Sequence, residues 1–205
     1  MISLDEIKDE DNFSHSIFVT YPRTIQISHG VYDNVVDMMN ITTMISQNID
    51  NTELTNVYGG KTPWGFFNDK PEFIRFMDYV FKKHSNSNSF FNKNNWYDKT
   101  IVYDSWGNQI KKGDHVAMHT HKDYHLILYL TEGAPLILPE LKMTITPKQG
   151  SYYIFPPHLL HGVKKVESDG ITRYCLVSNI IEQPNWKTKK VINDFINEKD
   201  KIEVK

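Results

Sequence analysis

The sequence predicts a mainly β protein, a sandwich or jelly-roll barrel with α-helices at its flanks. Short alternating strands separated by Gly and Pro turns fill the segment from Tyr97 to Asn179. No helical pattern interrupts these strands, whereas helical patterns lie before and after them. Regular short strands of this kind are typical of a sandwich or jelly roll. The expected strands lie at about 100–104, 107–111, 114–120, 126–131, 135–138, 141–146, 151–155, 160–166 and 172–179.

The N-terminal half combines strands with helices. Residues 16–21 and 24–28 alternate between apolar and polar side chains, as strands do. Residues 32–45 carry apolar side chains at helical spacing. Residues 71–84 predict a clearer helix, because Pro71 suits a first turn and the last turn is basic.

We therefore expect one domain, 1–205, with three parts. Residues 1–98 form an N-terminal support region of helices and strands, and a polar loop at 85–95 closes it. Residues 99–182 form the barrel core. Residues 183–205 contain an amphipathic C-terminal helix.

Composition excludes several classes of protein. The net charge of −2 at pH 7 gives no overall attraction to nucleic acid or to anionic membranes. The single cysteine, Cys175, lies in an apolar run, so a disulfide framework is excluded. The acidic N-terminus does not resemble a signal peptide, and no apolar stretch is long enough to span a membrane. A cytoplasmic protein is expected.

Histidines gather in two short segments of the strand region. The first segment, G-D-H-V-A-M-H-T-H-K-D-Y-H, contains His119 and His121, and the second, G-S-Y-Y-I-F-P-P-H-L-L-H-G, ends with His161. Side chains two residues apart on a strand point to the same face, so His119 and His121 can bind one metal ion. A barrel brings sequence-distant strands together, which allows His161 to provide a third ligand. These residues predict a metal site.

Strand alternation also predicts which side chains face this site. Val116 and Met118 are expected on the opposite face of the first histidine strand. The sets that share the site's face are expected to be His115, Ala117, His119 and His121 on the first strand, and His125, Ile127 and Tyr129 on the next.

A basic residue opens the last strand of the barrel region. Arg173 precedes the run Y-C-L-V-S-N, and a buried guanidinium there would need an anion, for which a carboxylate has the matching planar shape. The alternative is a surface ion pair with Glu167 or Asp169. For Tyr129, packing within the barrel is the alternative to a role in binding.

The order of motifs is similar to that of a known enzyme family. The motifs are S-W-G-N-Q-I-K-K-G-D, H-T-H, L-Y-L, G-S-Y-Y-I-F-P-P-H-L-L-H-G-V and R-Y-C-L-V-S-N. From about Trp96 to Asn179 the chain resembles the Fe(II)- and 2-oxoglutarate-dependent oxygenases, and most of all the group common in bacteriophage genomes. The resemblance implies a double-stranded β-helix, a cupin-like jelly roll. It also implies a location in the host cytoplasm if the protein is phage-encoded.

The resemblance implies a role for each matching residue. Fe(II) would be bound by His119, by the residue two positions further on, and by His161. The distal carboxylate of 2-oxoglutarate would be held by Arg173, with Tyr129 as a hydrogen-bonding neighbour. No catalytic residue is implied beyond the metal ligands.

The second ligand position departs from the family pattern. Most such enzymes have an acid there, whereas this sequence has His121. A literal H-x-D also occurs, as His121-Lys122-Asp123, and it would make Asp123 the carboxylate ligand. The spacing from Gly113 favours the first alternative.

Two other functions stay open. The cupins share the barrel, and their motifs match Gly113, the H-x-H pair and His161, with His125 where a Glu is usual. A cupin-type metal dioxygenase or isomerase is therefore one alternative. A non-catalytic barrel that acts as a binding module is the other.

The function implied by the resemblance is oxidative. The protein would be a hydroxylase that couples the oxidation of 2-oxoglutarate by O2 to hydroxylation of a primary substrate that the sequence does not identify. We expect no membrane or nucleic-acid partner, and we retain a homodimer as an alternative to a monomer.

Overall fold

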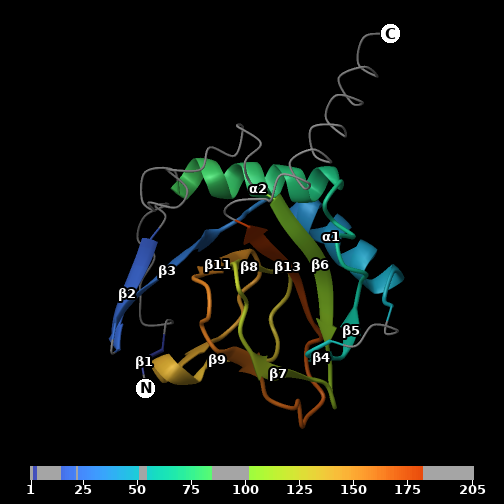
Figure 1. Ribbon diagram of the computed structural model, residues 1–205. Helices are drawn as coiled ribbons and strands as arrows, with labels where there is room; N and C mark the ends of the chain where they lie inside the picture. The colour runs from blue at the N-terminus through green and yellow to red at the C-terminus, as the bar shows by residue number, and fades with distance from the viewer. Residues whose placement is uncertain (1, 4–14, 22, 51–54, 85–101, 182–205) are drawn as a thin grey trace.

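The computed structural model describes residues 2–3, 15–21, 23–50, 55–84 and 102–181. In this part of the chain two sheets of mainly antiparallel strands pack face to face, with helices outside one of them (Figure 1). The predicted jelly-roll fold is confirmed. The expected loop at 85–95 and the expected C-terminal helix lie outside the described residues.

The larger sheet forms the wall that carries the helices. It has seven strands, and all its neighbours are antiparallel. In spatial order these are β2 (His15–Tyr21), β3 (Arg23–Val31), β11 (Ser151–Phe155), β8 (Tyr124–Tyr129), β13 (Arg173–Ile181), β6 (Val102–Ile110) and β5 (Gly60–Lys61).

The smaller sheet closes the other side of the barrel. It has six short strands, and only the β1–β10 pair is parallel. In spatial order these are β1 (Ile2–Ser3), β10 (Met143–Ile145), β9 (Leu136–Leu138), β12 (His161–Val163), β7 (His115–His119) and β4 (Val57–Tyr58). Strands from the N-terminal half therefore complete both sheets.

Two helices cover the outer face of the larger sheet. Helix α1 spans Val35–Gln47, and helix α2 spans Pro71–His84 as the sequence predicts. Asn34 caps α1, because its side chain accepts a hydrogen bond from the Asp37 amide at 3.1 Å. Neither helix of the described chain is long and apolar enough to cross a membrane.

The two faces of the larger sheet belong to two separate hydrophobic cores. The outer core joins the helices to alternate strand residues, among them Leu126, Leu128 and Leu176. The inner core lies between the sheets and contains Ile127, Tyr129 and others. Side chains along β8 thus alternate between the two cores, which is the alternation of faces that the sequence predicts for this strand.

The strand expected at 100–104 and the one expected at 107–111 are one strand, β6. The break expected at residues 105–106 is wrong, and Gly107, next to it, lies in the middle of the strand and allows α1 to pack closely. A Cβ on Gly107 would lie 2.2 Å from Cγ1 of Ile45. The glycine is thus required by packing and not by a turn.

The strand expected at 141–146 is shorter than predicted. A 3-10 turn, η3 (Pro139–Leu141), comes first, and Lys142 adopts a left-handed conformation with φ of 53°. Strand β10 begins only after this residue, because a left-handed residue cannot continue the extended backbone.

Candidate metal centre

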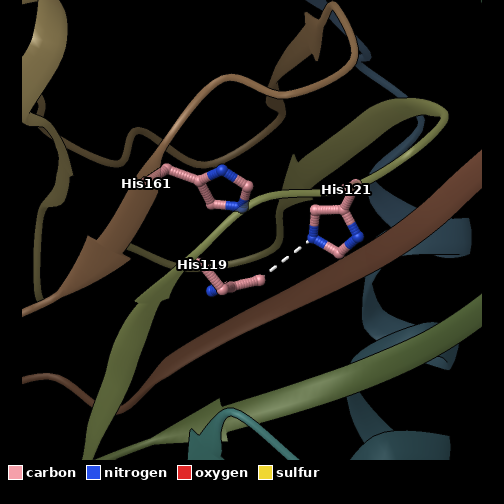
Figure 2. Close-up of side chains that lie close together, drawn as sticks. All are labelled: His119, His121 and His161. Carbon is pink, nitrogen blue, oxygen red and sulfur yellow. Dashed lines mark hydrogen bonds between the residues drawn. The ribbon is translucent and has the colours of Figure 1, made fainter.

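Three histidines meet at one end of the barrel. His119 ends β7, His121 follows it, and His161 begins β12 (Figure 2). Their ligand nitrogens all lie within 4.8 Å of one another, and His119 Nε2 is 3.1 Å from His121 Nε2. The structure thus brings together the three residues that the sequence singles out as a site. Asp123 is not a member of this group.

A β-bulge in β7 aims His119 at the site. His119 pairs with His161, whereas Val116 pairs with Val163, so three residue steps on β7 oppose two on β12. The bulge places both Val116 and His119 on the inner side.

The bulge corrects the prediction that His115 and Ala117 share a face with His119. His115 instead stacks on Tyr58, which is 57% exposed, with ring centroids 4.2 Å apart. The prediction for Val116 is also wrong, because this residue lies in the inner core, whereas Met118 is exposed as expected. Strict alternation fails here because a bulge shifts the phase of a strand by one residue.

Backbone hydrogen bonds orient two of the three rings. The Nδ1 of His119 lies 2.7 Å from the Ala117 carbonyl oxygen, and the Nδ1 of His161 lies 2.8 Å from that of Leu159. A carbonyl can only accept, so each Nδ1 carries the proton, and each Nε2 keeps its lone pair for the site. The buried His161 Nε2 has no hydrogen-bond partner among the described residues.

The site keeps its histidines neutral. Burial, together with neighbouring histidines, lowers the pKa of His121 to about 3. Burial likewise lowers the pKa of His161 to about 4 and lowers that of His119. Neutral imidazole is the form that binds metal ions. The Nε2 atoms of His119 and His121, 3.1 Å apart, and the unpartnered Nε2 of His161 are therefore well suited to bind one cation together.

A fourth histidine, His125, packs against the ligand group. The ring of His125 stacks on that of His121, with centroids 3.7 Å apart and planes 13° apart. Its Nδ1 lies 3.0 Å from Oδ1 of Asn179. His125 is not a member of the ligand group. The four-histidine arrangement of the cupin alternative is not formed.

Arg173 and Tyr129 are both in the barrel interior. Arg173 is 3% exposed and Tyr129 is fully buried. The guanidinium carbon lies 5.1 Å from the Tyr129 ring centroid, and Nη1 donates to the Ala134 carbonyl at 3.0 Å. The alternative of a surface ion pair is wrong, because Arg173 is buried and Asp169 pairs with Lys112.

Each of these two side chains has a polar atom that makes no hydrogen bond to the described residues. The Arg173 Nε and the Tyr129 hydroxyl are buried without a hydrogen-bond partner among the described residues. Both residues lie on the sheet face that carries His125, because Tyr129 pairs with Cys175 and His125 pairs with Asn179. The Arg173 guanidinium and the Tyr129 hydroxyl are therefore buried on the same sheet face as His125, whose ring stacks on that of His121.

The sequence interpretation used the W-G-N motif for the family resemblance but gave no site role to its Trp106 and Asn108, which lie on this wall. Trp106 and Asn108, on β6, are 3% and 7% exposed, and their side chains face the barrel interior. The Trp106 ring centroid lies 6.4 Å from that of His121. Alternation on β6 puts Trp106, Asn108 and Ile110 on one face, and the Asn among apolar neighbours was the available signal.

No family model and no curated protein matches the sequence. Solved structures do match the fold. A prolyl-4-hydroxylase from Pseudomonas putida aligns over 77% of this chain and 93% of its own, with 10% identity and a TM-score of 0.57. HygX from Streptomyces hygroscopicus, with nickel and 2-oxoglutarate bound, aligns over 77% and 83%, with 10% identity and a TM-score of 0.53.

A viral protein gives a third match. The collagen prolyl hydroxylase of Paramecium bursaria Chlorella virus-1, in complex with 2-oxoglutarate, aligns over 74% of this chain and 94% of its own, with 14% identity and a TM-score of 0.50. At these identities the likeness establishes a shared double-stranded β-helix fold. Function must be argued from the site itself.

Proposed function

We propose that the protein is a non-haem Fe(II)- and 2-oxoglutarate-dependent oxygenase, with His119, His121 and His161 as metal ligands. One observation carries the proposal: the converging histidine nitrogens and a buried Arg173–Tyr129 pair lie in the same barrel interior. The first group suits a transition-metal ion, and the second suits a carboxylate. 2-Oxoglutarate offers both a metal-chelating end and a distal carboxylate. The proteins of like fold include two described with 2-oxoglutarate bound.

The donor set fits iron, although it departs from the usual pattern of two histidines and one carboxylate. Three neutral nitrogens leave the charge of Fe(II) less compensated than a carboxylate would. An anionic co-substrate would add the missing negative charge. We infer that 2-oxoglutarate increases the metal affinity of this three-histidine site more than it would increase that of a site with two histidines and one carboxylate.

The residues of the chain would bind and orient the reactants. When bound, iron supplies the activation of O2 and the oxidising chemistry. Arg173 would hold the distal carboxylate through its Nε and Nη atoms, and the Tyr129 hydroxyl would donate a second hydrogen bond. Carbonyl hydrogen bonds at Nδ1 keep the rings of His119 and His161 fixed. The enclosing inner core excludes bulk water.

The test is anaerobic addition of Fe(II) and 2-oxoglutarate to the metal-free protein, followed by visible spectroscopy. A charge-transfer band should appear only when both are present. The same protein with Fe(II) and succinate, which lacks the 2-oxo group, is the control and should show no band. Metal binding without a band would contradict the proposal and would favour a cupin-type metal site.

A further inference from the structure

The inner face of β6 carries a second group of unsatisfied polar atoms, on a different strand from Arg173 and Tyr129. The Trp106 indole N–H and the Asn108 Oδ1 are both buried without a hydrogen-bond partner among the described residues. Leaving either atom unsatisfied destabilises the fold, since each has lost its water. Two such atoms on one strand, two residues apart, indicate a ligand that completes them.

The position of this pair is next to the metal centre. The Trp106 ring centroid lies 6.4 Å from His121 and 6.1 Å from His125. Asn108 is opposite Cys175 across the β6–β13 ladder, and Cys175 is opposite Tyr129 across the next one. Asn108 is therefore two strands away from Tyr129. Arg173 is opposite Ile110, so the pair lies on the strand next to the one that carries Arg173.

Trp106 packs against a second tryptophan, Trp64, which is partly exposed to solvent. The Trp64 ring packs edge-on against Trp106 with centroids 4.3 Å apart. Trp64 is 43% exposed, and the buried Lys61 ammonium lies 3.8 Å from its ring centroid and donates to the Thr62 carbonyl. Trp64 thus lies between Trp106 and solvent.

The chemistry of the two atoms selects a class of ligand. The indole N–H can only donate, and Asn108 Oδ1 can only accept. A carboxylate would satisfy the indole but would place its negative charge toward the Asn108 oxygen. Residues two apart on a strand have Cα atoms roughly 6.6 Å apart, which favours an acceptor and a donor on different atoms of the ligand. An amide provides both, as C=O and N–H.

We propose that Trp106 and Asn108 form a primary-substrate subsite that binds an amide group, with the indole donating to its oxygen and Asn108 accepting from its nitrogen. The inference deepens the proposed function, because it assigns the substrate class of the same site. The amide belongs either to a peptide backbone or to a free carboxamide, and the two sources differ in whether the nitrogen is substituted.

The test is NMR of the metal-free, 15N-labelled protein, observing indole N–H resonances. The spectrum of Trp106→Phe identifies the Trp106 resonance. N-acetylglycine methylamide, which represents a peptide, and propionamide, which represents a carboxamide, are titrated separately. We expect a downfield, saturable shift with at least one of them, and the tighter of the two identifies the source. Methyl acetate, which has no N–H, should bind roughly tenfold more weakly.

Variants separate recognition from folding. Asn108→Leu removes the acceptor at similar volume and should weaken amide binding roughly tenfold. The matched control is Gln109→Leu, which removes an amide from the outer face of the same strand, where Gln109 bonds to Tyr174 at 2.6 Å. This control should leave amide binding unchanged.

Three results would overturn the inference. They are no amide-induced shift of the Trp106 resonance, an equal response to 2-propanol, and a response only to 2-oxoglutarate in zinc-loaded protein. The last result would assign the pair to the co-substrate. The amide titrations need neither metal nor 2-oxoglutarate, so failure of the proposed oxygenase function would appear separately, as a missing charge-transfer band.

Discussion

The two faces of the larger sheet differ in how their buried polar groups are satisfied. On the outer face the buried Asp37 carboxylate accepts hydrogen bonds from Arg75, Asn34 and Tyr32, and His84 Nε2 lies 2.9 Å from the Tyr152 hydroxyl.

On the inner face, buried atoms of Trp106, Asn108, Tyr129 and Arg173 have no partner among the described residues, and the same is true of His161 Nε2 on the smaller sheet opposite. A fold is stabilised by satisfied groups, whereas unsatisfied ones are retained where a ligand completes them. The outer face therefore satisfies its buried polar groups within the fold, whereas the inner face leaves several of them available to a ligand.

The largest effect is expected for His161→Ala. Loss of one of three ligands should abolish stoichiometric metal binding. The metal-free variant should still fold but with a lower unfolding temperature, because a buried ring and the hydrogen bond of its Nδ1 to the Leu159 carbonyl are lost. Equilibrium dialysis and calorimetry measure both quantities. His115→Gln, which alters an outward histidine on β7, is the control and should bind metal normally. Full occupancy in His161→Ala would contradict the assignment.

The next largest effect is expected for Arg173→Lys. An ammonium is a point charge and cannot present two parallel N–H groups, so 2-oxoglutarate should bind about a hundredfold more weakly, a loss of about 3 kcal/mol. Metal affinity should be almost unchanged. Calorimetric titration of 2-oxoglutarate into zinc-loaded protein checks both values. Equal weakening of metal and 2-oxoglutarate binding would instead indicate a general structural defect.

The outer face should make stability depend on pH through His84. Burial, with the charges of His29 and Lys83, lowers the pKa of His84 to about 4 from 6.5. The unfolded chain then binds more protons than the folded one between these values. Stability is therefore full above about pH 6.5 and falls as the pH decreases to about 4, by at most about 3 kcal/mol.

The measurement is urea unfolding of the metal-free protein across this pH range, compared with His84→Gln. Gln keeps a hydrogen-bonding group near Tyr152 but does not titrate. The variant should show the smaller decrease, since the inner histidines contribute equally to both proteins. Identical pH profiles would exclude a contribution from His84.

The smallest effect is expected for Asp123→Asn. Asp123 is not a member of the ligand group, so metal affinity should stay within about threefold of wild type, whereas His119→Ala should lose most of it. Metal titrations of both variants compare the two ligand alternatives. The opposite pattern would shift the site two residues along the chain.

The sequence predicted the parts of this molecule that depend on local pattern. Alternation along β8, the start of α2 at Pro71 and the meeting of His119, His121 and His161 all follow from short-range periodicity and motif spacing. Arg173 at the start of β13 follows from the same reasoning.

The features that the sequence did not predict arise from contacts between distant segments. The bulge in β7 depends on pairing with β12. The continuity of β6 through Gly107 depends on packing of Ile45 against it. The unsatisfied state of Trp106 and Asn108 becomes visible only when every neighbour on the opposite sheet is in place. In each case the residues in contact are far apart in the chain, so no short segment of the sequence contains both of them.

The most direct test of the central claim is a crystal structure of the protein grown anaerobically with Mn(II), as a substitute for Fe(II), and 2-oxoglutarate. We predict the metal at roughly 2.1 Å from nitrogens of His119, His121 and His161, as is usual for metal–imidazole bonds. The Arg173 guanidinium and the Tyr129 hydroxyl should contact the distal carboxylate. A metal bound through Asp123, or 2-oxoglutarate away from Arg173, would contradict the account.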